Sequence, residues 1–227
     1  MKTLAAGLIG LVALGAVLAV PDRPAIAASE PQELVEKARL TAERLLNHPE
    51  FSMLRGWMRR AKGVLVVPSL LKAGFLVGGE GGSGVLLAFD RNKGWSDPAF
   101  YTLGAGSFGL QFGFQDSQVI FVIMTDKGLE ALINKRVKLG VDASVAVGPT
   151  GAGVEGATTA GLGADIYSFS LSRGMFGGVS FEGSVAIERN DWNRSYYGEG
   201  ATPTAIVMER KFTNAQTSGL RKALEVK

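Results

Sequence analysis

An alternating stretch between Leu103 and Met124 constrains the fold of this chain most. Large apolar residues occupy every second position in its middle: Phe108, Leu110, Phe112 and Phe114. A period of two is typical of a β-strand with one buried face. The opposite face carries Gly109 and Gly113, and glycine is unfavourable in a strand unless another backbone or a ligand lies close. We therefore predict a central strand with a tightly packed glycine face.

Residues 115–118 are polar and predict a turn, after which the apolar run Val119 to Met124 predicts a second, buried strand. Other strand patterns cover residues 64–67, 74–77, 85–89, 141–148, 165–172 and 179–188. Helical spacing or capping residues predict helices at 29–46, at about 51–60, after Thr125 and at 214–224. We expect an α+β fold: a curved antiparallel sheet or partly closed β-barrel of about seven strands, with N-terminal, connecting and C-terminal helices packed on it.

The first 27 residues have the pattern of a signal peptide. Lys2 supplies the positive start, Leu4 to Val20 is apolar, and Ala25-Ile26-Ala27 is an A-x-A cleavage signal. We expect export to the periplasm or cell envelope, a mature chain that starts at Ala28, and a single domain over residues 28–227. The alternative is an uncleaved membrane anchor, because the apolar run is at the lower limit for crossing a bilayer.

Composition excludes several classes of function. The chain has no cysteine, which excludes thiol catalysis and cysteine-bound zinc, and an exported form must be stable without disulfides. Its net charge of +3 is too small to indicate nucleic-acid binding. A single histidine, His48, gives little support for a transition-metal site or for Ser-His-Asp chemistry. We expect no cofactor and no catalytic residue.

Several sequence blocks, in order, resemble the SYLF-domain family of lipid-binding proteins. They are Gly63-Val64-Leu65-Val66-Val67-Pro68, Lys72-Ala73-Gly74-Phe75, residues 104–113, residues 139–149, residues 167–179 and Tyr196-Tyr197-Gly198. The resemblance implies membrane-lipid binding without catalysis. Eukaryotic members are linked to phosphoinositides and actin, so for an exported bacterial protein only generic membrane or anionic-lipid binding carries over. Glu80 and Ser83 stand where related sequences often carry an aromatic and a basic residue, so no phosphate contact is assigned to that segment.

A basic segment with one tryptophan is the candidate lipid site. It contributes Arg55, Trp57, Arg59, Arg60 and Lys62, and Lys72 in a family block completes the set. Tryptophan favours the membrane interface and clustered cations favour anionic headgroups. The alternative is a core Trp57 beside a solvated basic face. At the level of function, the alternative to a lipid-binding protein is a structural or interaction module that binds a protein partner, with an uncharacterised hydrolase as a third possibility.

One further motif has the spacing of a nucleotide-binding loop. Gly104, Gly106 and Gly109 spell the dinucleotide fingerprint G-x-G-x-x-G. That fingerprint functions only when a helix begins after it and directs its N-terminus at the pyrophosphate. A predicted strand follows here instead, so the spacing does not indicate a nucleotide site.

Overall fold

The computed structural model describes residues 29–134, 136–148, 163–174 and 183–226, apart from the side chains of 75–77, 107–112 and 174. Its centre is a seven-stranded sheet with the strand order β2-β1-β3-β6-β5, in which β7 also pairs with β3 and β4 pairs with β7. The strands are β1 (Gly63–Asp90), β2 (Gly94–Trp95), β3 (Ala99–Ile123), β4 (Arg136–Lys138), β5 (Val145–Val147), β6 (Ile166–Gly174) and β7 (Val185–Glu188). All pairs are antiparallel except β5 with β6. The sequence-based expectation of an α+β protein with a curved sheet is confirmed.

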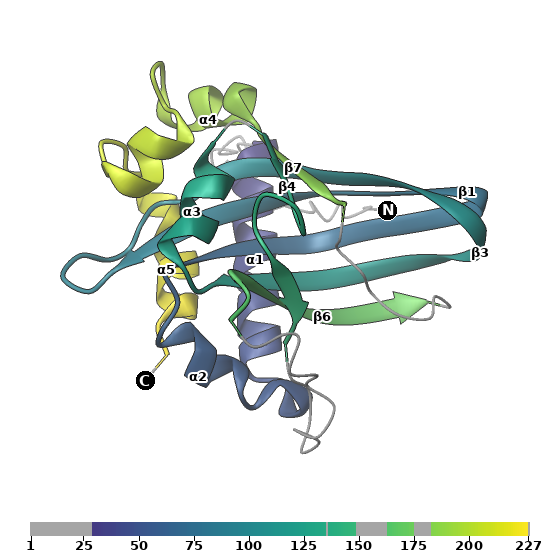
Figure 1. The fold of residues 1–227 in the computed structure, drawn as a ribbon. Coiled ribbons are helices and arrows are strands. Elements are labelled where there is room, and N and C mark those ends of the chain that lie inside the picture. The colour runs from purple at the N-terminus through teal and green to yellow at the C-terminus, as the bar shows by residue number, and fades with distance from the viewer. Residues whose placement is uncertain (1–28, 135, 149–162, 175–182, 227) are drawn as a thin grey trace, which may run out of the picture.

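Two very long strands, β1 and β3, form one hairpin that runs through the whole molecule (Figure 1). The turn predicted at residues 115–118 is wrong, because β3 continues through it. The reason lies in β6: the Gln115 side-chain amide donates to Ser172 Oγ at 2.7 Å, and Ser117 Oγ lies 2.9 Å from the same oxygen. Polar side chains that signal a turn in isolation are instead buried and paired across two strands.

The three short strands predicted between residues 64 and 89 are one strand in the structure. Pro68 was expected to end the first of them, but the pairing with β3 only shifts its register between Val67 and Leu70. A bulge accommodates a residue without a backbone N–H while the strand continues. The glycine-rich segment 78–84, which lies between two of the predicted strands, is part of the same strand.

The sheet curls until the two halves of β1 meet. The backbone N–H of Phe89 donates to the carbonyl of Lys62 at 2.8 Å. A Cβ added at Gly84 would lie 2.9 Å from Val66 O, and one added at Gly82 would collide with Ser69 O. Glycine allows this close approach of backbone to backbone, and the curl gives the partly closed barrel that the sequence predicted.

Alternate residues of the two long strands face two separate cores. Val64, Val66, Ile120 and Val122 face the core that includes the apolar sides of three helices, α1 (Glu30–Leu46), α2 (Leu54–Met58) and α5 (Ser218–Leu224). Their neighbours Leu65, Val67, Val119 and Phe121 face the core that includes α3 (Asp126–Ile133) and the π-helix η4 (Thr204–Met208). The continuous apolar runs in the sequence follow from burial on both faces.

Local signals located most of the helices. Thr125 Oγ accepts from the Gly128 N–H at 3.0 Å and caps α3 as predicted. Ser29 occupies the N-cap position of α1, but its side chain makes no capping hydrogen bond. The second predicted helix is divided into the 3₁₀-helix η1 (Pro49–Phe51) and α2, and the C-terminal one into η5 (Ala215–Thr217) and α5. Helix α4 (Asn190–Tyr197) and η4 were not predicted.

In the part of the chain that the structure describes, no helix has the length and apolar character needed to cross a membrane. The predicted signal peptide lies outside the described residues.

Candidate functional site

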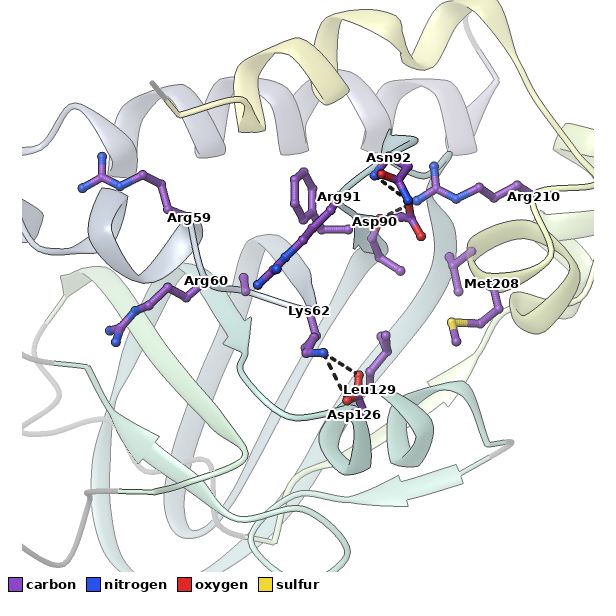
Figure 2. A pocket seen from close by; sticks show the side chains of 14 residues that line it. Arg59, Arg60, Lys62, Asp90, Arg91, Asn92, Asp126, Leu129, Met208 and Arg210 are labelled. Atoms are coloured by element: carbon purple, nitrogen blue, oxygen red, sulfur yellow. Dashed lines mark hydrogen bonds and ion pairs between the residues drawn. The ribbon is translucent and has the colours of Figure 1, made fainter.

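An open pocket of about 470 Å³ lies where the α2–β1 connection, the β1–β2 turn, α3 and the end of η4 meet (Figure 2). We call it the basic pocket. Its cationic lining residues are Arg59, Arg60, Lys62, Arg91 and Arg210. Its carboxylates are Asp90 and Asp126, and its apolar side chains include Phe89, Leu129, Val207 and Met208. Three of the six predicted site residues, Arg59, Arg60 and Lys62, therefore line one pocket.

Backbone hydrogen bonds fix the basic segment at the root of the long hairpin. The N–H of Lys62 donates to Ile123 O at the end of β3, and the carbonyl of Lys62 accepts from Phe89 near the end of β1, both at 2.8 Å. The backbone of Lys62 is therefore held between the C-terminal ends of β3 and β1. Its Nζ forms an ion pair with Asp126 of α3 at 3.1 Å, although the two side chains are 46% and 73% exposed.

The turn after β1 presents Arg91 to the pocket. Asp90 Oδ1 accepts from the backbone N–H groups of Asn92 and Lys93 at 2.8 and 2.9 Å, which closes the turn. These two bonds, first that from Asn92, hold the pKa of Asp90 below its ordinary value, so this carboxylate is ionised at neutral pH.

Arg210 fastens this turn to the C-terminal part of the chain. Its guanidinium donates to Gly94 O at 2.7 Å, and at 3.4–3.5 Å to the carbonyls of Lys93 and Ala88. Arg210 has a φ of 55°, in the left-handed region that residues with a Cβ rarely adopt. It follows closely on a π-helix, another rare backbone conformation that is frequent at functional sites. The wall of the pocket is thus built from two unusual backbone segments.

The cationic side chains of the pocket differ in whether they already interact with other groups of the protein. Arg60 stacks on the Trp57 ring, with its guanidinium carbon 5.2 Å from the ring centroid. Arg91 is exposed, and within the described residues its guanidinium has no hydrogen bond or ion pair. Figure 2 shows the Arg91 side chain extending from its turn toward the side of the pocket where Arg60 and Lys62 lie. The pocket therefore concentrates positive charge that its two carboxylates do not balance.

The other three predicted site residues lie elsewhere. The Arg55 guanidinium donates to Leu46 O at 2.9 Å and to Asn47 Oδ1, so it closes the C-terminal end of α1. Trp57 is half-buried against the core beside α1, with its ring centroid 4.2 Å from that of Tyr167. Lys72 is paired in register with Gln115, away from the pocket along the hairpin. The fold therefore separates residues that the interpretation of the sequence grouped.

Sequence reasoning missed Arg91 and Arg210, which come from the β1–β2 turn and from the segment after η4. Both stand in short, strongly polar stretches, Asp90-Arg91-Asn92-Lys93 and Glu209-Arg210-Lys211. That composition marks exposed turns but carries no information on which turns meet.

The other candidate chemistries receive no support from the geometry. Strand β3 runs through the G-x-G-x-x-G spacing, so no helix follows it to receive a pyrophosphate. His48 Nδ1 accepts from the Glu50 N–H at 3.4 Å and its ring lies against Phe51. Among the described residues, no group of three or more His, Asp or Glu side chains is arranged to hold a metal ion.

A curled mixed sheet with helices packed on it, and an open basic pocket at the root of its long hairpin, characterise this chain as an α+β domain. Residues 104–227 match the family model described as "Ysc84: Las17-binding protein actin regulator". This match covers more than half of the chain, and the chain belongs to the Ysc84 family, also known by its SYLF domain. The resemblance found in the sequence is confirmed at the level of the family.

Curated relatives come from yeast and mammals. The chain is 35% identical over 156 residues to LAS seventeen-binding protein 3 of Saccharomyces cerevisiae, an alignment that covers 67% of this chain and 34% of the relative. It is 33% identical over 204 residues to human SH3 domain-containing YSC84-like protein 1, covering 86% of this chain and 59% of the relative. The chain thus spans about a third to three fifths of these relatives. The yeast relative is named for a protein that it binds, and the family model is described as an actin regulator.

Proposed function

We propose that this protein is a non-catalytic interaction module whose main ligand is a protein partner. The observation that carries the proposal is the basic pocket, which gathers cations from separate chain segments on an open surface. Relatives named for the proteins they bind or regulate support this function. They share only part of their length with this chain, so their own partners are not transferred to it.

Affinity capture tests this proposal. The full chain is immobilised and exposed to extract from the source cells, in parallel with an Arg60→Glu/Arg91→Glu variant and an Arg194→Glu control. Arg194 is an exposed arginine on α4 outside the pocket, so the control makes one such charge reversal at a site away from the pocket. We expect a protein that the wild type and the control retain and that the double variant loses. The proposal would be overturned if the wild type enriched no protein from the extract.

A second candidate function is binding to anionic membrane headgroups. It is favoured by one specific observation: Arg59 and Arg60 are exposed and lie with Lys62 on one short connection beside Trp57. Cations near an anionic leaflet attract it by about 1 kcal/mol each. Vesicle sedimentation with neutral and anionic lipid separates this candidate from the first.

We propose the cell envelope as the place where either function is exercised, on the strength of the signal-peptide pattern ending at Ala27. N-terminal sequencing of protein isolated from the source cells tests this. A mature chain starting at Ala28 would support export, whereas an intact Met1 or Lys2 would favour the membrane-anchor alternative.

A further inference from the structure

We infer that the basic pocket binds an acidic peptide segment that carries a large apolar side chain next to its carboxylates. The inference rests on the proposed function and names the chemistry of the partner. It is carried by the division of the pocket into a cationic side and an apolar side, and by a guanidinium that no protein group occupies among the described residues.

The cationic side is suited to carboxylates. Arg60 is oriented by its stacking on Trp57, and Arg91 is presented by a turn that Asp90 and Arg210 hold in place. A guanidinium offers parallel N–H donors that match a carboxylate in bidentate fashion. Arg91 can therefore bind one acidic side chain at the pocket, and Arg60, whose side chain extends away from Arg91 and Met208 in Figure 2, can bind a second one at the edge of the pocket.

The apolar side gives the pocket a second requirement. In Figure 2, Met208 and Leu129 lie across the pocket from Arg60. Met208 is 48% exposed although it is a large apolar residue, and Val207 beside it also lines the pocket. An unbranched thioether adapts to different apolar partners, which makes methionine common at peptide-binding surfaces. An apolar side chain of the ligand would cover this exposed surface.

Two carboxylates favour a peptide over a membrane as the occupant. Asp126 is an exposed lining residue paired with Lys62, and Asp90 is held ionised by its turn. A diffuse anionic surface would be repelled by both groups, whereas a peptide can place its acidic residues at the arginines and keep them away from Asp126.

Fluorescence anisotropy with labelled peptides tests the inference on the full chain. The probe peptide has a block of glutamates followed by leucine. One control peptide has glutamine in place of glutamate, and another has serine in place of leucine. We expect binding of the probe peptide that falls with rising salt, weaker binding of the serine peptide, and none of the glutamine peptide.

Two variants assign the two sides of the pocket. Arg91→Gln should weaken binding of the probe peptide about tenfold, which is the loss expected for a charge-assisted hydrogen bond. Arg194→Gln should leave binding of the probe peptide unchanged. Met208→Ser should weaken the leucine peptide about fivefold, as for roughly 40 Å² of lost apolar burial, and leave the serine peptide unaffected. Circular dichroism confirms that each variant is folded.

Clear outcomes would overturn the inference. Probe-peptide binding that Arg91→Gln does not change would show that acidic peptides bind elsewhere. Binding to phosphatidylserine-containing vesicles without any binding to the peptide would assign the pocket to a membrane. If affinity capture identifies a partner that Arg91→Gln still retains, the proposed interaction module stands while the acidic-peptide site fails, so the two failures are distinguishable.

Discussion

Thr125 Oγ donates a 2.7 Å hydrogen bond to Asp165 Oδ1 and thereby joins the start of α3 to the segment that enters β6. Asp165 is only 7% exposed, and its other oxygen accepts from the N–H and Oγ of Ser144 and from Lys127 Nζ. Ser144 directly precedes β5, so one carboxylate connects three elements of the fold. We expect it to be the principal polar contact that holds β5 parallel to β6.

The first prediction concerns the loss of this carboxylate. Asp165→Asn cannot accept the same set of bonds and should lower the free energy of unfolding by about 1–3 kcal/mol at neutral pH. Urea unfolding followed by circular dichroism measures it. Glu130→Gln on the exposed side of α3 is the control and should change stability little. Equal stability of both variants would show that the carboxylate is dispensable.

The second prediction is a pH dependence of stability from the same group. Burial acts to raise the pKa of Asp165, but hydrogen bonds from Thr125, Ser144 and Lys127 outweigh it and lower the pKa to about 2 from 3.8. A lowered folded-state pKa stabilises the protein above the unfolded value and loses this contribution as the pH falls through the folded one. The wild type should therefore lose stability between about pH 4 and pH 2 more steeply than Asp165→Asn. The free energy of unfolding is measured by urea titration at each pH. If it falls equally steeply with decreasing pH in the wild type and in Asp165→Asn, the prediction is contradicted.

The third prediction tests the close approach of the two halves of β1. A Cβ at Gly84 would lie 2.9 Å from both Val66 O and Val67 Cγ2, and a backbone carbonyl cannot move cheaply. Gly84→Ala should lower the free energy of unfolding by about 1–3 kcal/mol through overpacking. Gly106→Ala on β3 is the matched control, because a Cβ there meets nothing within 4 Å. Thermal unfolding compares them, and a melting temperature for Gly84→Ala as high as that of the control would argue against the curl.

The fourth prediction distinguishes the two interpretations of Trp57. Its ring packs on Tyr167 and the core beside α1, so Trp57→Ala should cost about 1–3 kcal/mol of stability, less than a fully buried tryptophan. Trp57→Phe should retain most of it. The substitution should affect ligand binding only by releasing Arg60, which stacks on the ring. A stable Trp57→Ala variant that loses membrane binding would instead support an interfacial tryptophan.

What the sequence predicts well depends on local signals. Thr125 is followed three residues later by the N–H that it caps, so α3 is found from its own residues. Gln115 bonds to Ser172, 57 residues away, and local reading therefore assigns it to a turn. The site shows the same division: Arg59, Arg60 and Lys62 are neighbours in the chain, whereas Arg91 and Arg210 join them only through the pairing of β1 with β2 and the carbonyl contacts of Arg210. Periodicity identifies strands but does not determine which turns meet.

The fifth prediction belongs to the candidate membrane function. If Arg59 and Arg60 contact anionic headgroups, each contributes about 1 kcal/mol to binding. The affinity of the double alanine variant for anionic vesicles should then be lower than that of the wild type by roughly tenfold or more. Added salt should reduce the advantage of the wild type by screening. Folding should change little, because both side chains are exposed. Vesicle sedimentation on neutral and anionic lipid measures the loss.

Arg55 supplies the internal control for that experiment, because it carries the same charge in the same segment but is directed to the end of α1. Arg55→Ala removes bonds to Leu46 O and Asn47, so it should lower stability by about 1 kcal/mol and leave vesicle binding near the wild-type value. If vesicle binding instead depended only on a general electrostatic attraction, alanine substitution of Arg55, Arg59 or Arg60 would weaken it equally. Wild-type binding that is the same on neutral and anionic vesicles, and unchanged in the double variant, would exclude the segment as a lipid site and leave the basic pocket to a protein ligand.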